Sequence, residues 1–461
     1  MLVLGIPPAV VKMGQEGLLE RAFHDGLFPA LQFRQEAVAE EWPANTGTSL
    51  FMSRPGLLVP VTRPLAPGVD PLPQALSFEQ WEARLERFAN SIDTHMPTSA
   101  VANANLFLRN IHQLGLNAGQ SLNRVPRNAL FKAYLSGQTN LIVAGAAADT
   151  TIRVAAINGF TDVVNPAGDV RPSPVSPATP LSITIAGVAG PRNVIGATPD
   201  NPNDPFGPGT LQLSAALGAI VAVRSAVISS AAPLVLRSGG GTSVDAIGAG
   251  DVFTLQDAIN AVNRLRRNNV PPHEDGYYHA HISTEANSQV FTDPAFQRLN
   301  TALPNGAIYQ EGFIGTIAGI MFFLNNECPD SLNSGALVAT GASSVYAEDI
   351  GAEVINATGV RIGRILVTGR GALYERWLNE DAYVSEAGIT GKMGEFQVVN
   401  AGLNITTERI KLILRAPLNR LQDQVAASWS ITTCFPVPTD ITSGTGPERY
   451  KRAICIEHAM S

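Results

Sequence analysis

Hydrophobic and polar positions alternate most clearly between residues 251 and 325. Leu255, Ile259 and Val262 recur at helical spacing and give one apolar stripe. Thr254 immediately precedes this stripe, and Asp257 follows Thr254 by three residues, which is the pattern of a capping box. We therefore expect a helix that begins after Thr254 and ends before the two prolines at positions 271 and 272.

The same stretch predicts further elements in order. Aromatic and β-branched residues from Gly276 to Ile282 indicate a strand. A second helix is expected after Thr284. We expect this helix to restart at Asp293, because Asp293 is a capping residue and Pro294 follows it at the first helical position. After a loop at 304–306, the apolar run from Gly312 to Leu324 contains glycines and suggests packed strands. The predicted unit is helix, strand, helix, glycine-rich turn, strand.

In this order, the elements resemble the central part of tailed-bacteriophage major capsid proteins, in the podophage subgroup of the Johnson-type capsid fold. The motifs that carry the resemblance are Asn268-Asn269-Val270-Pro271, Asp275-Gly276-Tyr277-Tyr278, Asp293-Pro294 and Gly312-Phe313-Ile314-Gly315-Thr316-Ile317-Ala318-Gly319. Two positions depart from the family pattern. Ser283-Thr284 stands where the family has His-Pro, and Ala318 replaces the first glycine of a Gly-Gly pair.

A later stretch is similar to the closing strand segment of the same family. It comprises Ala416-Pro417-Leu418-Asn419-Arg420, then Ala427-Ser428-Trp429 and Ile431. Ser428 and Ser430 stand in place of the family's glycine and lysine. The resemblance covers residues 56–146 and 249–435.

The resemblance implies an α+β fold of the phage major-capsid type. It divides the chain into an N-terminal arm (1–55), an extended hairpin loop (56–94), a spine helix with the first part of the peripheral domain (95–146), a β-rich insertion (147–248), an axial domain (249–385), and a peripheral return with the C-terminal tail (386–461). The arm alternates short helical pieces with Pro-Gly and Asn-Thr-Gly breaks, so we expect it to take its stability from neighbouring subunits.

Residues 77–93 fit two secondary structures. A helical stripe, preceded by a capping box from Ser77 to Gln80, comprises Phe78, Trp81, Leu85, Phe88 and Ile92. A strand is also compatible, because Trp81, Ala83 and Leu85 alternate with charged residues. The pattern alone favours the helix, whereas the resemblance places the second strand of the extended hairpin here. We expect the strand.

A long helix is predicted over residues 102–135, at the position of the family's spine helix. Its apolar stripe comprises Leu108, Ile111, Leu114, Ala118, Leu122, Val125, Ala129 and Ala133. An ordinary core helix predicts the same stripe. Pro126 lacks a backbone donor and should kink or restart the helix.

Residues 147–248 contain no lysine and no glutamate but many Val, Ile, Thr, Ala, Gly and Pro. Leu181 to Ile185 alternates as a half-buried strand does. A disordered linker is the alternative, but low charge and β-branched content oppose it. We expect an inserted β-rich module, longer than the linker that the family usually carries. The chain then returns through Arg364–Tyr374, and late alternating strands are expected at Phe396–Val399 and Ile410–Leu414.

Composition narrows the functional classes. Charged residues are 15% of 461 and the net charge is −7, which argues against a nucleic-acid-binding surface. Cys328, Cys434 and Cys455 have no metal or redox spacing, and we expect reduced thiols of a cytosolic product. The start of the chain has no export signal, and the apolar runs fall short of the ~20 residues of a membrane span, so we expect a soluble protein.

Two stretches offer candidate chemistry. His279 and His281 share one face of the predicted strand, near His273, Glu274 and Asp275, but a zinc site needs three or four converging ligands. Structural or exposed histidines explain this pattern better. The glycine run from Ser238 to Ser243 lacks the lysine of a phosphate loop and does not sit between a clear strand and helix. We therefore expect no catalytic, cofactor-binding or metal site, and no enzyme.

The resemblance implies a major capsid protein that assembles as hexamers and pentamers into the icosahedral shell around the dsDNA of a tailed phage. Expected partners are copies of itself, separate scaffolding and portal proteins, and cement proteins; the expected location is the virion, after assembly in the host cytoplasm. Residues 56–93 contain no lysine, so a lysine–asparagine cross-link from this loop is not expected. Arg264, Arg266 and Arg267 either face the genome or complete a helix end.

Two alternatives remain open at this point. One is a soluble enzyme or binding protein with a β-rich accessory domain, for which the sequence offers no set of converging polar groups. The other is an encapsulin-like compartment, which shares the capsid fold and would differ in cargo-docking features.

Overall fold

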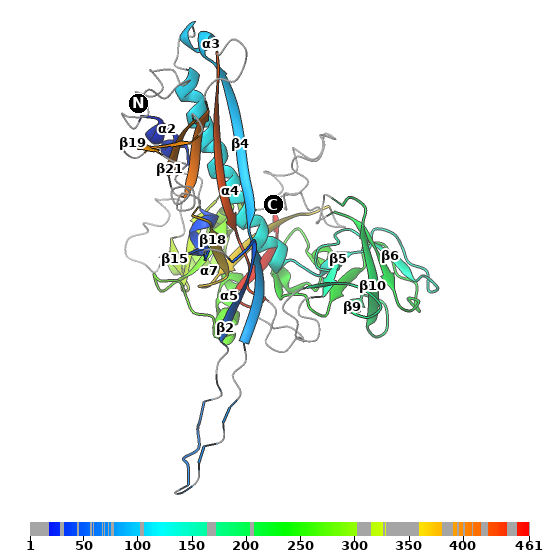
Figure 1. Cartoon of the computed structure of the whole chain (residues 1–461). Coiled ribbons are helices and arrows are strands. Elements are labelled where there is room, and N and C mark those ends of the chain that lie inside the picture. The colour runs from blue at the N-terminus through cyan, green and yellow to red at the C-terminus, as the bar shows by residue number, and fades with distance from the viewer. Residues whose placement is uncertain are drawn as a thin grey trace. The chain divides into compact units, whose positions relative to one another are not determined.

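The computed structural model describes residues 18–27, 32–43, 46–55, 58, 60–66, 68, 70–71, 73–74, 78–101, 106–163, 172–202, 207–301, 315–325, 328, 359–379, 391–393, 396–399, 402–407, 409–415, 423–439 and 450–460. Helices and strands mix along the chain, which confirms the α+β class (Figure 1). The chain divides into two compact units. Unit 1 comprises Met1–Leu50, Ala83–Arg127 and Leu373–Pro436, and unit 2 comprises Phe51–Glu82, Asn128–Ala372 and Val437–Ser461.

Within the described residues, unit 1 contains an eight-stranded sheet. Its strands are β1 (Ala37–Glu41), β4 (Glu86–His95), β18 (Leu373–Trp377), β19 (Gly391–Met393), β20 (Phe396–Val399), β21 (Gly402–Thr407), β22 (Ile410–Arg415) and β23 (Gln424–Cys434). The order is β1-β18-β23-β22-β21-β20-β19, and β4 pairs with β23 outside this path. The β1–β18 pair is parallel and the β4–β23 pair antiparallel. Three distant stretches of sequence thus build one sheet.

Two helices of unit 1 pack on this sheet, α2 (Leu18–Leu27) and the first part of α4 (Leu106–Tyr134) (Figure 1). The core between them contains the buried side chains of Phe23, Leu27, Phe107, Ile111, Leu114, Ala118, Leu122, Ile410, Leu412, Leu414, Val425, Ala427, Trp429 and Ile431. Glycines allow the helices to approach closely. A Cβ at Gly115 would lie 2.3 Å from the Phe23 carbonyl oxygen, so a larger residue would push α2 away.

The long helix α4 confirms the prediction for residues 106–134, and residues 102–105 lie outside the described part. Ile111, Leu114, Ala118 and Leu122 are buried as the stripe predicts. Pro126 does not restart the helix, which continues through it. One missing backbone hydrogen bond therefore does not outweigh the packing of this long helix.

In unit 2, a six-stranded mixed sheet has the order β13-β24-β17-β14-β16-β15 over the described residues. Its strands are β13 (Val235–Arg237), β14 (Tyr278–Ile282), β15 (Thr316–Ile317), β16 (Ile320–Leu324), β17 (Arg361–Thr368) and β24 (Ala453–Met460). β24 is a central strand of this sheet. It belongs to residues 386–461, which the resemblance assigned to the peripheral return and C-terminal tail. Every residue of β24 is buried, because β13 and β17 flank it within the sheet and residues of α5 share a core with its side chains.

Three helices of unit 2 follow the sequence predictions. They are α5 (Leu255–Arg267), α6 (Thr284–Thr292) and α7 (Pro294–Thr301). Thr254 and Asp257 form the predicted capping box of α5. Asp293 separates α6 from α7, and its carboxylate accepts hydrogen bonds from the backbone N–H groups of Ala295 and Leu255. The predicted helix–strand–helix order is confirmed, while residues 302–314 lie outside the described part.

A second sheet of unit 2 confirms the β-rich character of the predicted insertion. Its described strands are β5 (Gln138–Asn140), β6 (Thr151–Val154), β9 (Leu181–Ile185), β10 (Arg192–Pro199), β11 (Gly209–Leu213) and β12 (Ala226–Ser229), in the order β5-β12-β9-β10-β11-β6. β7 (Asp162–Val163) and β8 (Ser173–Pro174) form a separate pair. The sheet has its own core, which includes Phe160, Ile183, Val194 and Leu211.

Strand β2 (Ser49–Pro55) pairs with β3 (Phe78–Arg84), and β4 pairs with β23, so the described part of the segment, from residue 78 to residue 93, forms strands on either side of Leu85. The helical pattern was a wrong guide, and Ser77 lies outside the described residues. Glu79, Trp81 and Ala83 are buried, and the residues between them face outward or lie half-buried. This period of two is that of a strand. Among the described helices, none has the length and apolar character that a membrane crossing needs. The predicted segments at residues 1–17 and 416–420 lie outside the described part.

Candidate functional site

The base of the β2–β3 hairpin in unit 2 contains a buried carboxylate. Glu79 accepts hydrogen bonds from the Arg54 guanidinium at 2.5 and 3.0 Å, and Lys451 Nζ lies 3.3 Å from its other oxygen. The Arg54 guanidinium also lies 5.5 Å from the ring centre of Trp81. Burial raises the pKa of Glu79, but the two cations outweigh it, so the pKa lies below the usual value. The hairpin base is therefore joined to the segment before β24.

Beyond this base, the described residues of the hairpin are exposed and partly apolar. Leu58, Val61 and Leu65 have exposed fractions of 56%, 80% and 56%. Phe51 and Phe78, at the start of the hairpin, are about half exposed. These apolar side chains gain nothing from packing within the single chain, so the segment is a candidate contact surface.

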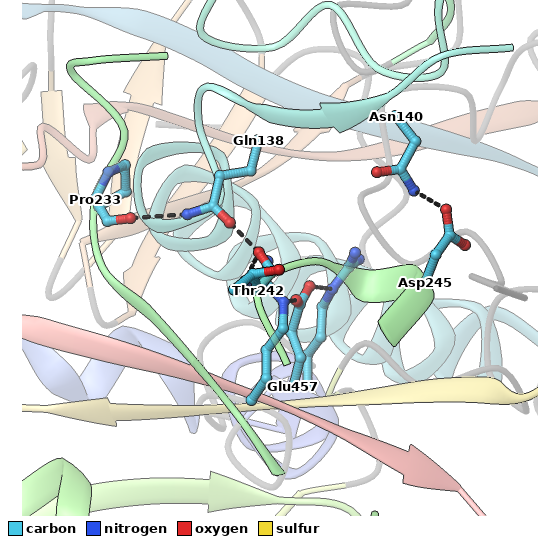
Figure 2. Close-up of polar contacts among 8 residues, drawn as sticks. Gln138, Asn140, Pro233, Thr242, Asp245 and Glu457 are labelled. Carbon is cyan, nitrogen blue, oxygen red and sulfur yellow. Dashed lines mark hydrogen bonds and ion pairs between the residues drawn. The ribbon is translucent and has the colours of Figure 1, made fainter. Parts of the chain in front are cut away.

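A second polar cluster joins the insertion sheet to the central sheet of unit 2 (Figure 2). Glu457 on β24 is buried, and its two oxygens accept hydrogen bonds from Arg237 Nε at 2.9 Å and Arg364 Nε at 3.2 Å. Arg237 Nη2 also donates to Gln138 Oε1 at 2.6 Å. Gln138 in turn donates to the Pro233 carbonyl at 2.8 Å. A chain of hydrogen bonds thus runs from β5 to β24.

Exposed apolar side chains also gather on loops of the insertion sheet. Ile142 and Val143 follow β5, whereas Ile220 and Val223 lie between β11 and β12. A bridge between Gly145 and Val221 holds the two loops together. This pair of loops is a second candidate contact surface.

Unit 1 has a buried carboxylate of its own. Glu375 on β18 accepts hydrogen bonds from Arg34 Nε and Nη2, at 2.6 to 3.1 Å, and from Arg409 Nη1 at 3.2 Å. The Arg409 guanidinium lies 5.3 Å from the ring centre of Trp377. Arg34 belongs to the short 3-10 helix Phe33–Glu36 before β1, so this ion pair fixes the N-terminal segment to the sheet.

The histidines that the sequence singled out differ in their surroundings. His281 is buried on β14 and its ring stacks on Phe323, at 5.5 Å between centres. His279 is half-buried; its ring stacks on His273 at 3.9 Å, and its Nε2 lies 2.9 Å from Asp275 Oδ2. The structure therefore brings His273, Asp275 and His279 together and leaves His281 in the core.

The glycine run after β13 is a tight turn next to acidic groups. Gly239 has a φ of 78°, and a Cβ there would lie 2.3 Å from an Asp251 carboxylate oxygen. Ser238 Oγ donates a hydrogen bond to Asp257 Oδ2 at 2.9 Å. Two carboxylates face the run, so it is unsuited to a phosphate group.

Arg266, one of the three arginines at the end of α5, has a partner within unit 2. Arg266 lies beside Tyr278, whose hydroxyl donates to the Val270 carbonyl at 2.7 Å. Burial raises the pKa of Tyr278, and Arg266 opposes this shift in part. Arg266 therefore helps to fix the helix end.

Sequence reasoning missed the buried acids Glu79, Glu375 and Glu457. Glu79 and Glu375 lie on strands with an alternating pattern, where nothing distinguishes them from exposed glutamates, and Glu457 lies on β24, a strand that the sequence analysis did not predict. The available signal was composition, since the cations of the chain are almost all arginine, which suits fixed, forked ion pairs.

Comparison with known proteins gives structural but no sequence matches. No protein-family model matches the chain, and no curated protein matches it. The chain is similar to the solved capsid structure of the cyanophage P-SCSP1u (TM-score 0.46, 13% identity, 94% of this chain and 89% of that chain). It is also similar to the capsid of Ralstonia phage GP4 (TM-score 0.45, 13% identity, 95% and 91%). A third similar structure is the capsid asymmetric unit of cyanophage Pam1 (TM-score 0.45, 10% identity, 94% and 92%).

Proposed function

We propose that this chain is the major capsid protein of a tailed phage, which self-assembles as hexamers and pentamers into an icosahedral shell around dsDNA. The observation that carries the proposal is the β2–β3 hairpin, with a buried ionic base and exposed apolar residues beyond it. In a subunit of an assembly, such a hairpin can bury its apolar side chains against a neighbour, whereas in an isolated enzyme these side chains would stay in water. The motif order of residues 249–325 supports the same conclusion.

The proposal includes partners and location. The chain binds copies of itself, is placed in the virion, and assembles in the host cytoplasm with separate scaffolding and portal proteins and with cement proteins. The net charge of −7 suits a container whose wall does not bind its DNA tightly. The contacts are non-covalent, and no enzymatic step is part of the proposal.

Electron microscopy of the purified full-length chain, with light scattering, tests this function. We expect closed shells, tubes or capsomer-sized rings, with or without a co-expressed scaffolding protein. A monodisperse monomer or dimer under all these conditions would contradict the proposal and favour a soluble enzyme or binding protein. Shells that package a host protein instead of DNA would favour the encapsulin-like alternative.

Variants of the hairpin test the observation that carries the proposal. We expect the double substitution Val61→Asp and Leu65→Asp to abolish assembly and leave the circular dichroism spectrum unchanged, because both side chains are exposed in the single chain. Thr62→Asp is the control for charge alone, since it adds one carboxylate beside Val61 without removing an apolar side chain, whereas the double variant adds two. If the double variant assembles as the unmodified chain does, the hairpin is not the contact surface.

A further inference from the structure

The outer edge of strand β4 is a long row of backbone groups with no partner strand among the described residues. β4 has ten residues, and in the described part of the chain it pairs with β23 alone. The ladder runs from Glu86 to His95 without a shift of register, and the strand contains no proline and no lysine. Proteins usually protect an exposed edge with a bulge, a proline or lysines. β4 has none of these, so its edge is open to a further strand.

A hydrogen bond at the end of β4 shows which groups form this edge. Met96 follows β4, and its N–H donates to the Asp423 carbonyl at 2.8 Å, in continuation of the β4–β23 ladder. In an antiparallel strand, the N–H and C=O groups of successive residues point alternately to the two sides. The residues of β4 whose backbone groups point away from β23 are therefore Arg87, Ala89, Ser91, Asp93 and His95.

Two other hydrogen bonds agree with this assignment. Leu85 precedes β4 in the same alternation, and its N–H donates to the Thr48 carbonyl at 2.9 Å and not to β23. The Ser91 N–H donates to the side-chain oxygen of Asn90 at 2.8 Å, so a local side chain takes the place of a partner strand. All five outward-pointing residues have exposed side chains. The edge is therefore accessible along the length of β4 and ends at Leu85.

The side chains make this edge complementary to itself. When two copies of β4 pair antiparallel about a two-fold axis at Asn90, Arg87 of one copy lies directly opposite Asp93 of the other. The symmetry repeats this contact of opposite charges. On the other face of the strand, Phe88 lies opposite Ile92 of the copy. Both apolar side chains pack on the core of unit 1 and are only half-buried, so the pairing would remove more of their surface from water.

Other registers of the same pairing lose this complementarity. A shift of one strand by two residues in one direction sets Arg87 opposite His95, and a shift in the other direction sets Arg87 opposite Ser91. Neither shifted register places a cation opposite Asp93. Shifts by one residue would set outward-pointing groups against groups that already bond to β23. Charge and hydrogen bonding therefore select the register that is centred on Asn90.

We propose that β4 of one chain pairs edge to edge with β4 of a second copy, antiparallel, across a two-fold axis at Asn90. The eight-stranded sheet of unit 1 then continues into the same sheet of the copy. The contact is isologous, because the same strand serves on both sides. It is separate from the hairpin contact, whose exposed residues belong to unit 2. The proposal does not rest on the capsid function, because a two-fold pair of chains needs no shell.

Oxidative cross-linking at the symmetry centre tests the pair directly. Asn90 lies opposite Asn90 of the copy in a pair without mutual hydrogen bonds, where the Cβ atoms are about 4.5–5.5 Å apart, close to the span of a disulfide. We expect the full-length chain with Asn90→Cys to form a disulfide-linked dimer on mild oxidation, both in solution and in any shells. The three cysteines of the unmodified chain are buried, so they should not interfere.

Glu86→Cys is the matched control for the cross-link. Residue 86 is exposed like Asn90 and lies on the same face of β4, but its counterpart in the copy is eight residues away along the strand, or about 27 Å. This variant should give no dimer. Equal cross-linking of the two variants, no dimer with Asn90→Cys, or a link from Asn90→Cys to a different protein alone would overturn the proposal.

Exchange of the two charges gives a readout that a purely structural role would not produce. Arg87→Asp and Asp93→Arg, each added to Asn90→Cys, should reduce the cross-linked dimer about tenfold, because two contacts of opposite charge become two contacts of like charge. A mixture of the two variants should restore the dimer, since every acidic side chain then faces an arginine. Within one chain the two positions are about 20 Å apart, so restoration requires contact between chains. A mixture that cross-links no better than either variant alone would contradict the register.

A proline at the edge tests the backbone hydrogen bonds. The Ala89 N–H points away from β23, so Ala89→Pro removes a donor to the copy and leaves the β4–β23 ladder complete. In the Asn90→Cys background, this substitution should abolish the dimer and leave the circular dichroism spectrum unchanged. Undiminished cross-linking would show that β4 does not pair through its edge. If Ala89→Pro does not fold, the charge exchange decides between the same two outcomes.

Discussion

His458 on β24 is a fully buried imidazole between acidic neighbours. It faces Gly363 on β17, where a Cβ would lie 2.6 Å from its Nε2, and its ring lies 5.8 Å from that of Phe253. Burial lowers its pKa from 6.5 to about 4, although the Ala459 carbonyl and the charges of Asp257 and Glu457 oppose this shift. The folded chain therefore keeps His458 neutral where the unfolded chain would protonate it.

This residue should make the fold sensitive to acid. Between pH 6.5 and pH 4 the unfolded state binds the extra proton, so stability falls as the pH falls through this window, by up to about 3 kcal/mol. In His458→Gln, which does not titrate, the free energy of unfolding should depend less on pH over the same window. Denaturant unfolding at a series of pH values measures this. If the free energy of unfolding changes with pH equally in the two chains, His458 does not contribute to the acid sensitivity.

At the scale of single residues, the sequence predicted local chemistry and missed distant partners. The Thr254–Asp257 capping box was predictable because its partners are three residues apart. The partners of Glu375 were not, because Arg34 lies 341 residues away along the chain. The stacking of His273 on His279 was equally hidden, since it depends on the reversal at Gly276.

At the scale of elements, the insertion depends on one buried ionic junction. Arg237→Ala leaves the buried Glu457 with Arg364 alone and removes the hydrogen bond to Gln138. We expect a loss of about 3 kcal/mol in the free energy of unfolding, because a buried charge loses a partner. Limited proteolysis should also cut faster between residues 230 and 250, where the insertion joins the central sheet.

Arg153→Ala is the matched control for this prediction. Arg153 pairs with Asp200 inside the insertion sheet, but the side chains are 48% and 36% exposed. Exposed pairs contribute less than about 1 kcal/mol, so this variant should unfold nearly as the unmodified chain does. A similar loss of unfolding free energy in both variants would show that the buried junction contributes no more than an exposed ion pair.

The strands at residues 78–95 show where periodicity fails at this scale. Phe88 and Ile92, like Trp81 and Leu85, are four residues apart, and a spacing of four places two residues on one face of a helix and also of a strand. The pairing of strands, and not the spacing of apolar residues, determined the secondary structure of this segment. β4 forms an antiparallel ladder with β23 from Glu86 to His95, and Phe88 and Ile92 pack on the core of unit 1 from that strand.

At the scale of the whole molecule, the chain should form shells without covalent links. A lysine of the extended hairpin would be needed for a lysine–asparagine link, and residues 56–93 have none. Purified shells that are boiled in detergent should therefore run on a denaturing gel as one band near 48.7 kDa. A ladder of multiples of this mass would contradict the prediction.

The parallel pairing of β1 with β18 has a consequence for the time at which the molecule folds. Ala37 pairs with Leu373, so unit 1 cannot close its sheet before about four-fifths of the chain has been synthesised. Contacts so distant in sequence form slowly, because the chain must first close a long loop. The central sheet of unit 2 closes later still, because its strand β24 spans Ala453–Met460 and pairs with both β13 and β17. A subunit that is built this way cannot associate with its neighbours while it is still being made.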